Sequence, residues 1–326
     1  MRLLALPRLA VGLLALAALC RPALAEDFPN RAITILVPLA PGGGVDFVAR
    51  TIGQKLSERL GKPVLVENRP GGGTVVAAVA LAKAPPDGYT LLLTPGGTLT
   101  SNVAVYKNLP YDPRKDFVPI ALPSQVAFTL VVNPSLPVHS IAELIKYAKE
   151  KPGELIVGTA GIATTTHLAG EMLSHLTGIK LRYAHYRGTP PAMNDVIAGN
   201  IQMLFSDPVT GAELAKAGKV RPIGVTSKNR VSVFPDIPPI SDTVPGYEAT
   251  NWHMILTPAN TPADVVEKLS AEIRAIGAMP EVRQQIDKLG LEPLDSPSPR
   301  ELRAFLDADI TRWGKLVEQI GLAGSL

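Results

Sequence analysis

From residue 33 onward, short apolar runs with the length of a strand alternate with longer segments that have helical periodicity. The runs are rich in Val, Ile and Leu and lack a two-residue alternation, which is typical of strands buried on both faces. Alternating strand and helix units predict a largely parallel, three-layer α/β architecture. The candidate strands are residues 33–37, 64–66, 90–93, 118–122, 130–132, 155–158, 181–183, 203–205 and 223–226.

The predicted helices have clear start and stop signals. Residues 45–60 repeat apolar side chains at every fourth position, and Gly61 follows the last of them. Ser140, with Glu143 three residues later, forms a capping box. Three more helices are expected to start with an N-cap residue and a proline, at Thr189-Pro190, Thr261-Pro262 and Ser298-Pro299, the last with Glu301 as a second capping box.

The first 25 residues have the pattern of a cleaved signal peptide. Arg2 and Arg8 supply the positive start, residues 9–19 are apolar, and Ala23-Leu24-Ala25 is a small-residue cleavage site. The apolar run is too short for a membrane anchor. Cys20 raises a lipoprotein as an alternative, but the preceding Leu19 fits such a site poorly. We therefore expect an exported, periplasmic protein.

The leader holds three of the 32 Lys and Arg residues and none of the 29 Asp and Glu residues. The mature chain is therefore close to neutral, which gives no reason to expect nucleic acid or anionic lipid as a partner. It also has no cysteine, and so no disulfide. The length allows two lobes, and the 31 prolines are dispersed rather than gathered in a linker. We expect the lobes to be joined by crossing strands.

A glycine-rich loop lies between the first predicted strand and the first predicted helix. Gly42, Gly43 and Gly44 let backbone N–H groups approach a ligand without a Cβ in the way. The helix behind them offers unpaired N–H groups and a partial positive charge, so the loop is suited to an anion. The alternative is a tight turn that binds nothing.

Two more loops with glycine and threonine also follow predicted strands. One covers residues 94–98 and contains Thr94 and Thr98. The other covers residues 158–167 and contains Gly161, Thr164 and Thr165. In open parallel sheets, ligands lie outside the carboxyl ends of the strands. Because all three loops lie at such ends, we favour a ligand site among them.

Three single residues stay open between a ligand role and a structural one. Asp207 follows a predicted strand, where it either accepts a hydrogen bond from a ligand or caps a turn. Arg187 either pairs with a carboxylate or is a surface arginine, which we prefer. Trp252 either lines the cleft or packs in the core.

Motifs of common catalytic and cofactor sites are absent from the sequence. It contains no G-x-S-x-G, no phosphate-binding G-x-x-x-x-G-K-[ST] and no H-E-x-x-H. Residues 71–73 are glycine-rich but lack the spacing of a dinucleotide fingerprint, and no carboxylate pair stands out for acid–base work. We therefore predict a binding protein, not an enzyme, with no cofactor and no metal.

Several ordered motifs together resemble the Bug receptors, the extracytoplasmic solute-binding proteins of tripartite tricarboxylate transporters. The resemblance runs from about residue 29 to about residue 322. Its motifs are Pro41-Gly42-Gly43 with Asp46 and Arg50, Glu67-Asn68-Arg69-Pro70-Gly71, Pro86-Asp87-Gly88-Tyr89, His167-Leu168-Ala169, Tyr186-Arg187-Gly188, Ala217-Gly218-Lys219 and Pro235-Asp236-Ile237-Pro238.

The resemblance implies a type II periplasmic-binding fold with a ligand cleft between two lobes. We expect lobe 1 at residues 26–125 and 250–326, and lobe 2 at residues 126–249. The implied ligand is a small carboxylate: a dicarboxylate, a tricarboxylate, an acidic amino acid or an aromatic acid. In this family, backbone amides, hydroxyls and waters hold it, with few ion pairs. The implied partners are membrane permease subunits, and we expect a monomer.

The sequence departs from the family pattern in two ligand loops. Leu39 stands where an aromatic residue is common, and Ala163-Thr164 stands where Gly-Ser is common. The ligand is therefore expected to be atypical for the family.

We expect one set of residues from each lobe to hold the ligand: Gly42, Gly43 and Asp46 from lobe 1, and Gly161, Thr164, Thr165 and Asp207 from lobe 2, with Thr94 and Thr98 in second rank. Asp46 is expected to cap its helix and order the loop. Two alternatives from other classes are an exported sensor accessory that presents the ligand to a membrane signalling protein, and an exported α/β enzyme acting on a small organic acid.

Overall fold

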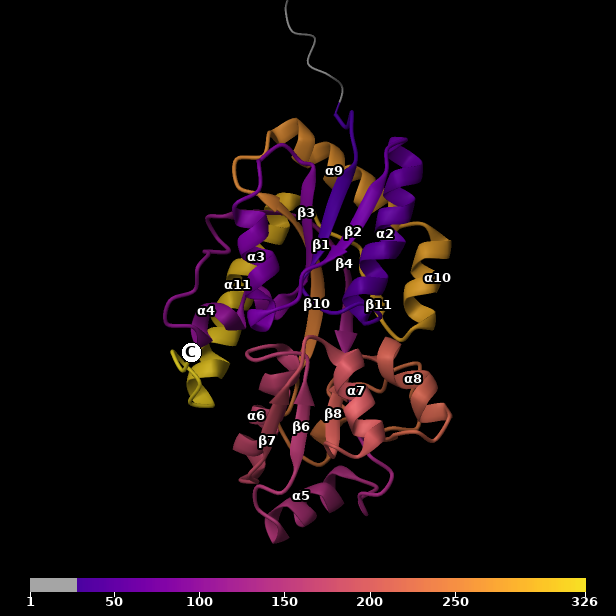
Figure 1. The fold of residues 1–326 in the computed structure, drawn as a ribbon, viewed down its shortest axis with the longest axis vertical. Helices are drawn as coiled ribbons and strands as arrows, with labels where there is room; N and C mark the ends of the chain where they lie inside the picture. Colours follow the sequence, from indigo (N-terminus) through magenta and orange to yellow (C-terminus); the bar gives the residue numbers. More distant parts are fainter. Residues whose placement is uncertain (1–27) are drawn as a thin grey trace, which may run out of the picture. The chain divides into compact units, whose positions relative to one another are not determined.

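The computed structural model of the protein describes residues 28–326, so the expected signal peptide and Cys20 lie outside the described residues. The fold described below is that of one compact unit, Arg31–Leu326. It contains two sheets, each with its own helices (Figure 1). We use lobe 1 for the part built on the six-stranded sheet and lobe 2 for the part built on the five-stranded sheet. This confirms the two-lobed α/β fold.

The sheet of lobe 1 has the strand order β11-β4-β10-β3-β1-β2. Its strands are β1 (Ile33–Val37), β2 (Val64–Asn68), β3 (Thr90–Pro95), β4 (Phe117–Ala127), β10 (Thr250–Pro258) and β11 (Glu292–Pro293). Its helices are α2 (Gly44–Leu60), α3 (Val75–Ala82), α4 (Ser101–Val105), α9 (Ala263–Gly277), α10 (Pro280–Lys288) and α11 (Pro299–Gln319), with the 3₁₀ turns η1 (Gly72–Thr74) and η2 (Gly96–Thr98).

The sheet of lobe 2 has the order β7-β6-β8-β5-β9. Its strands are β5 (Thr129–Val132), β6 (Ile156–Thr159), β7 (Arg182–His185), β8 (Met203–Ser206) and β9 (Arg221–Val225). Its helices are α5 (Ile141–Glu150), α6 (Thr165–Thr177), α7 (Thr189–Ala198) and α8 (Pro208–Lys216), and η3 (Ile240–Asp242) follows β9.

Both sheets are mixed, so the prediction of a largely parallel architecture is wrong. Strand β1 is parallel to β2 and β3, and β6 is parallel to β7 and β8. By contrast, β10 is antiparallel to β3 and β4, and β5 is antiparallel to β8 and β9. Parallel neighbours need a crossover connection, usually through a helix. The chain instead reaches β5 and β10 directly from the other lobe. Each of these strands therefore runs antiparallel to both of its neighbours in the sheet.

Two features of the strands were not predicted from the sequence. Strand β10 is not predicted, because Asn251, Trp252 and His253 interrupt its apolar run. Strand β2 is predicted as buried on both faces, but it is the edge of its sheet and Leu65 is 56% exposed.

Apolar side chains of α3 and α11 cover the same face of the lobe 1 sheet. Ala77 and Leu81 of α3 join Leu302 and Leu306 of α11 in one buried cluster with strand residues such as Leu92.

Helix α2 ends as predicted, with Gly61 in the left-handed conformation at φ 64°. Within the described chain, no helix has the length and apolar character needed to cross a membrane.

The predicted helix caps are half right. Ser140 accepts from the N–H of Glu143, and Ser298 and Glu301 form the capping box. The other two caps are wrong, because the N-cap positions are Gly188 and Pro262. In both cases the threonine hydroxyl bonds elsewhere: Thr189 donates to Asp207 and Thr261 donates to the carbonyl of Pro258.

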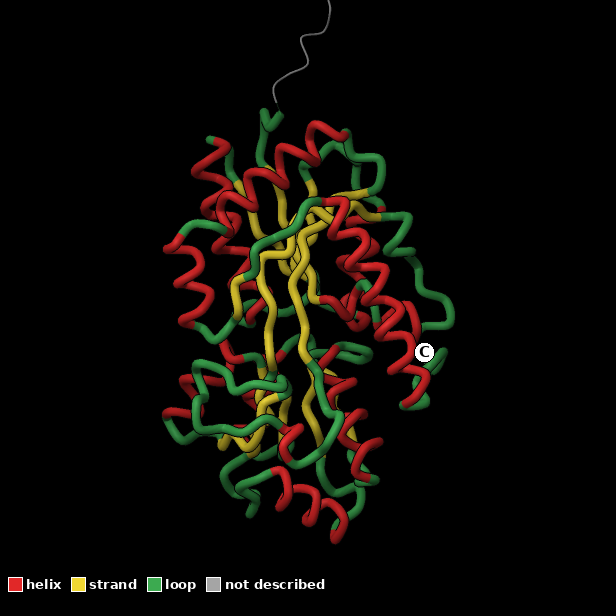
Figure 2. Tube along the Cα trace, turned by 180° about the vertical axis from the view of Figure 1, so that it is seen from behind, coloured by secondary structure: helices red, strands yellow, loops and turns green. Residues whose placement is uncertain are grey.

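The chain crosses between the lobes along extended segments, visible as long strands in Figure 2. Strand β4 ends at Ala127 and β5 begins at Thr129, so Phe128 alone separates the two sheets here. Phe128 donates its N–H to the hydroxyl of Thr226 at 2.8 Å and accepts from the N–H of Thr226 at 2.9 Å. The N–H of Ala249 donates to the carbonyl of Thr226 at 3.0 Å. These bonds hold the crossing segments side by side.

Candidate functional site

A pocket lies between the lobes, where the loops of both sheets meet; we call it the central pocket. The space between its lining atoms, with the open solvent at the mouth included, is about 610 Å³. Apolar walls are supplied by Leu39, Ala40, Val45, Pro95, Val126 and Phe128. Hydroxyl groups are supplied by Thr74, Thr98, Thr164, Thr165, Thr166 and Thr189. The pocket therefore has an apolar body with many hydrogen-bonding groups, which suits a small amphiphilic ligand.

Four helices begin at the central pocket. The N-cap residues of α2, α6, α7 and α8 all line it, namely Gly43, Thr164, Gly188 and Asp207. A helix N-terminus carries unpaired N–H groups and a partial positive charge. No Lys or Arg lines the pocket in the part of the chain that the structure describes. The charged and polar groups that a carboxylate would meet here are therefore helix N-termini, hydroxyls and the two acids Asp46 and Asp207, and no basic side chain of the described residues.

The loop before α2 is ordered by Asp46. Its Oδ2 accepts from the N–H of Gly42 at 3.0 Å, and its two oxygens accept from the guanidinium of Arg50 at 3.0 Å. Asn68 donates to Oδ1 at 2.9 Å. Burial opposes ionisation of Asp46, but these hydrogen bonds hold its pKa below the usual value. The prediction that Asp46 caps this helix is wrong. The N-cap residue is Gly43, and the Asp46 carboxylate accepts from the N–H of Gly42 in the preceding loop instead.

The loop after β3 presents a chain of hydroxyl groups. Thr94 donates to Thr98 at 2.6 Å, and Thr98 donates to Thr74 at 2.8 Å. Thr74 and Thr98 line the pocket, and Thr94 lies behind them. Thr74 has φ 82°, a strained conformation for a β-branched residue, and such strain often marks a functional site. Asn251 fixes the same loop by accepting from the N–H of Gly96 at 2.8 Å.

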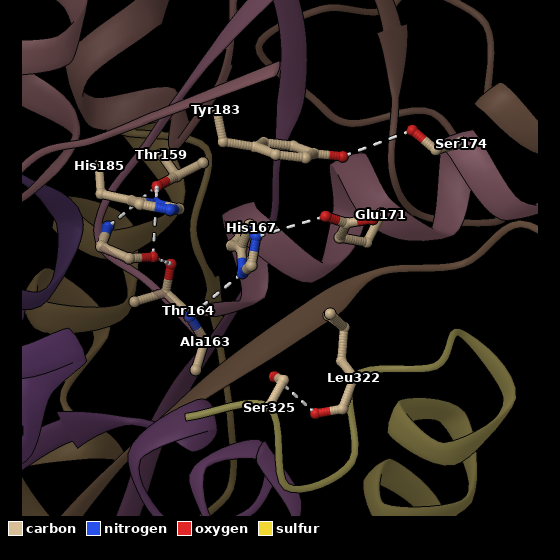
Figure 3. A network of polar contacts seen from close by, with 11 residues as sticks. Thr159, Ala163, Thr164, His167, Glu171, Ser174, Tyr183, His185, Leu322 and Ser325 are labelled. Atoms are coloured by element: carbon tan, nitrogen blue, oxygen red, sulfur yellow. Dashed lines mark hydrogen bonds and ion pairs between the residues drawn. The ribbon is translucent and has the colours of Figure 1, made fainter. Parts of the chain in front are cut away.

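The loop before α6 is held by hydrogen bonds within lobe 2 and from lobe 1. Thr164 donates its hydroxyl to the carbonyl of Gly161 at 2.7 Å. Ala163 has φ 58°, and its N–H donates to Nδ1 of His167 at 3.2 Å (Figure 3). Its carbonyl accepts from the hydroxyl of Ser101 in lobe 1 at 2.9 Å. The N–H and the carbonyl of Ala163 are therefore both hydrogen-bonded, and these bonds hold the residue in its strained conformation.

His167 lies in a cluster of aromatic and titratable side chains behind this loop. Its Nε2 lies 3.6 Å from Oε1 of Glu171, and its ring meets those of Tyr183 and His185 edge-on, with 4.9 Å between centroids in each case (Figure 3). His185 bonds to the hydroxyl of Thr159 at 2.8 Å. Burial lowers the pKa of His185, and the nearby His167 lowers it further. Because Nδ1 of His167 accepts a hydrogen bond from the N–H of Ala163, the proton of the imidazole ring lies on Nε2, which faces Glu171.

Thr165, the first residue of α6, has an unpaired hydroxyl. The residue is 2% exposed and lines the central pocket, yet its Oγ1 has no hydrogen-bond partner among the described residues. A buried polar atom without a partner loses its hydration and gains nothing in return, at a cost of about 1–3 kcal/mol. A ligand in the pocket would supply the missing partner.

Asp207 is a buried acid at the interface of the lobes. It caps α8 by accepting from the N–H of Thr210 at 3.0 Å, and it accepts from the hydroxyl of Thr189. Burial raises the pKa of Asp207, and the bonds from Thr189, Thr210 and the N–H of Gly44 offset only part of that rise. Since Gly44 starts α2, this carboxylate links the helix ends of both lobes.

The structure brings most of the expected site residues together. Gly43, Asp46, Thr98, Thr164, Thr165 and Asp207 line the central pocket. Gly42, Thr94 and Gly161 lie next to it and bond within their own loops. Trp252 does not line it: the ring packs in the core of lobe 1 and donates to Asp309 at 2.9 Å.

Sequence reasoning missed several residues that line the pocket. Phe128, Asn251 and His253 come from the crossing segments, Thr74 lies at the start of α3, and Thr189 was predicted only as a helix cap. Asn251 and His253 are polar residues beside the apolar run of β10, and this pattern was the sequence signal that could have identified them as pocket residues. In the described chain, no group of three or more His, Cys, Asp or Glu gathers to hold a metal ion.

Comparisons with known proteins agree on one family. Residues 48–322 match the family model described as tripartite tricarboxylate transporter family receptor. A UPF0065 protein encoded between tcbD and tcbE in Pseudomonas sp. strain P51 is 36% identical over 299 residues, which covers 91% of this chain and 88% of that protein. BugT of Bordetella pertussis is 30% identical over 310 residues, covering 94% and 95% of the two chains.

Solved structures match over almost their whole length. Rpa4515 of R. palustris, solved with adipate, has a TM-score of 0.87 at 34% identity, covering 91% of this chain and 99% of that one. MatC of Rhodopseudomonas palustris, solved with bound malate, has a TM-score of 0.85 at 30% identity, covering 89% and 100%.

Proposed function

The chain belongs to the family of tripartite tricarboxylate transporter receptors, and from that membership we propose that its central pocket captures a small organic acid by the carboxylate. As a member of this family it is a solute-binding receptor. The donors in this proposal are main-chain N–H groups and hydroxyls from both lobes, and no ion pair takes part. Gly43 acts from lobe 1, and Thr164, Thr165 and Thr166 act from lobe 2.

The observation that carries the proposal is the Thr165 hydroxyl. It is buried, it lines the pocket at the N-terminus of α6, and it has no partner among the described residues. The N-terminus of α2 lies across the same pocket. Two positive helix ends and an unpaired donor favour an anion with lone pairs to spare.

The remaining expected residues have supporting roles in this proposal. Asp46 and the N–H of Gly42 set the shape of the first loop, and Gly161 sets that of the third. Thr94 orients Thr98, whose hydroxyl borders the pocket. Ligand contacts on both sides draw the lobes together about the crossing segments. The proposed lobe boundaries lie between residues 125 and 126, two residues before the end of β4, and between 249 and 250, at the start of β10.

The apolar walls favour an acid with a hydrocarbon body. Leu39, Val45 and Phe128 face the space between the polar loops, and Leu39 widens the mouth relative to an aromatic side chain. The related structures with adipate and malate support aliphatic acids as the first class to test. In this proposal the protein is exported through a cleaved signal peptide, acts as a periplasmic monomer, performs no reaction and delivers its ligand to membrane permease subunits.

The test is a ligand screen on the exported chain by thermal shift, followed by calorimetry. The probes are succinate, adipate, citrate, glutamate and benzoate, each paired with its methyl ester. A ligand that binds only the folded state stabilises it by about 2.7 kcal/mol at 100 times Kd, so one acid class should raise Tm and its esters should not. Failure of every acid, or equal binding of acids and esters, would refute the carboxylate site. Product formation would refute a purely binding role.

A Gly43→Val variant tests the location. The backbone of Gly43 has φ −93°, which any residue adopts, so the fold should persist. Its side chain would approach Thr189 and Asp207 and fill the space before the N–H groups of α2. Unchanged affinity would place the ligand elsewhere.

A further inference from the structure

The sheet of lobe 1 forms one wall of the central pocket. Asn251 and His253 are two residues apart on β10, so their side chains point to the same face of the sheet. Their neighbours in the sheet are Val126 and Ser124 on β4, and Pro95 on β3 lies beside His253. Pro95, Val126, Asn251 and His253 all line the pocket. The strands therefore place an amide and an imidazole side by side on this wall.

The amide of Asn251 is held in one orientation. Its Oδ1 accepts from the N–H groups of Gly96 and Trp252, each at 2.8 Å. Two N–H donors to the same atom identify it as the oxygen, so Nδ2 is the other atom and carries two hydrogens. Asn251 is 6% exposed, and its Nδ2 makes no hydrogen bond to residues 28–326. The amide thus presents an unpaired donor to the pocket.

Ser124 determines which nitrogen of His253 carries the proton. Ser124 is fully buried, and Nδ1 of His253, at 2.9 Å, is the only partner of its hydroxyl within the described chain. A proton on Nδ1 would leave the hydroxyl hydrogen of Ser124 buried without an acceptor, which is costly. The hydroxyl therefore donates to Nδ1, and the proton of the ring lies on Nε2. Because burial lowers the pKa of His253 to about 4, the ring stays neutral at physiological pH.

Together the two side chains offer hydrogen-bond donors and no free acceptor. Nε2 of His253, like Nδ2 of Asn251, has no hydrogen-bond partner among the residues that the structure describes. Residues two positions apart on a strand are about 7 Å apart, and an N–H···O hydrogen bond is about 2.9 Å long. One ligand oxygen between the two side chains can therefore accept from both.

The surroundings favour an uncharged oxygen at this place. Asp46 and Asp207 line the same pocket, and no Lys or Arg among residues 28–326 does. A carboxylate against this wall would therefore meet only neutral donors while the two acids oppose its charge. A carbonyl oxygen carries two lone pairs and no hydrogen, so it can accept from both donors and leaves no hydrogen of its own unpaired.

We propose that Asn251 and His253 bind a keto oxygen of the ligand, that Ser124 is a positioning residue for the imidazole, and that the receptor prefers oxo acids to unsubstituted acids of the same length. This inference rests on the proposed function, in which helix ends and hydroxyls bind the carboxylate. The carboxylate is then recognised by the loops, and the group on the carbon chain is recognised by β10.

The experiment is calorimetry with oxo acids, each paired with the unsubstituted acid of the same length. The pairs are 2-oxopentanoate and 4-oxopentanoate with pentanoate, 2-oxoglutarate with glutarate, and 4-oxoheptanedioate with heptanedioate. At least one oxo acid should bind the wild-type chain at least tenfold more tightly than its unsubstituted partner, because the partner leaves both donors without an acceptor.

Two variants remove one donor each. His253→Phe keeps a ring and should weaken the preferred oxo acid about tenfold while leaving the unsubstituted acid within threefold. Asn251→Asp keeps the acceptor for Gly96 and Trp252. Its added charge should weaken both acids, but the ratio between them should still fall about tenfold. Thr257→Val is the control, since Thr257 is buried on the same strand and does not line the pocket, and it should change neither affinity.

The role of Ser124 is tested by nuclear magnetic resonance of protein labelled with ¹⁵N-histidine. The wild type should carry the His253 proton on Nε2, and the Nε2–H resonance should shift when the oxo acid binds. Ser124→Ala should move the proton partly to Nδ1 and lower the preference for the oxo acid about threefold. A proton on Nδ1 in the wild type, or an unchanged tautomer in Ser124→Ala, would rule out this positioning role.

The outcomes separate this inference from the proposed function. Equal binding of oxo and unsubstituted acids by the wild type, or an equal effect of His253→Phe on both, would overturn the inference while the carboxylate site stands. If no acid of either kind binds, the proposed function fails first and the inference fails with it.

Discussion

Nδ1 of His253 in β10 lies 2.9 Å from the hydroxyl of Ser124 in β4, and this buried hydrogen bond joins the two long strands that lead to and from the crossing segments. His253 is 2% exposed and also lines the central pocket. Burial lowers its pKa to about 4. The strands under the pocket are therefore joined through an imidazole that is neutral at physiological pH.

The first prediction concerns stability in acid. Between pH 6.5 and about 4, a histidine in the unfolded chain takes up a proton that His253 in the fold does not. The free energy of unfolding should therefore fall as the pH falls through this window, with a contribution from His253 of up to about 3 kcal/mol. Urea unfolding at pH 7, 5.5 and 4.5 measures it.

Two variants isolate that contribution from the carboxylates that titrate nearby. His253→Gln should be less stable at pH 7 but lose less unfolding free energy on acidification than the wild type. His139→Gln, at an exposed histidine, should keep the full pH dependence. Identical slopes for His253→Gln and the wild type would contradict the neutral, buried state of His253.

The second prediction concerns the unpaired hydroxyl of Thr165. Thr165→Val keeps the shape and removes an atom that has no hydrogen-bond partner among residues 28–326, so stability should stay level or rise slightly. Affinity for the acid found in the screen should fall about tenfold, because hydrogen bonds to charged groups contribute about 1.5–3 kcal/mol. Thr257→Val is the control: its hydroxyl in β10 is also buried and unpaired, but it does not line the pocket. Equal affinities of the two variants would argue against Thr165 as a ligand donor.

Local signals explain what the sequence predicted well. Gly61, Ser140 and Ser298 with Glu301 act within one turn of their helices, and these boundaries are as expected. The glycine loops follow strands whose apolar runs are continuous, so their place at the sheet ends was also predictable.

Contacts between distant segments explain what was missed. Thr189 has the sequence of an N-cap, but its hydroxyl bonds to Asp207, 18 residues later. Strand β10 is stabilised by pairing with β3 and β4 rather than by its own pattern, and it carries Asn251 and His253 into the pocket. The direction of a strand in a sheet depends on the path of the whole chain, so no local pattern reports it.

The third prediction assigns His167 a positioning role for the ligand loop. His167→Phe removes the acceptor for the N–H of Ala163, and the strained peptide should then relax. Acid affinity should fall about three- to tenfold, and hydrogen exchange at the Ala163 amide should become faster. His167→Asn retains an acceptor of similar reach and should restore much of both. His175→Phe, an exposed site on the same helix, should change neither, and a slow Ala163 amide in His167→Phe would rule out this role.

The last prediction concerns the charge of Asp207. Its carboxylate lies among the same helix ends that are to bind the ligand, so it repels a ligand carboxylate through a buried, weakly screened space. Burial raises its pKa above that of a free aspartate, so as the pH falls Asp207 takes up a proton before a ligand of low pKa does. Affinity should therefore rise as the pH falls from neutrality, down to the pH at which the ligand itself is protonated. Asp207→Asn should bind the acid more tightly at pH 7 and show a flat pH profile, and its amide oxygen can still cap α8. Calorimetry across this pH range decides the matter: if Asp207→Asn binds more weakly than the wild type at pH 7, Asp207 accepts a hydrogen bond from the ligand instead of repelling it.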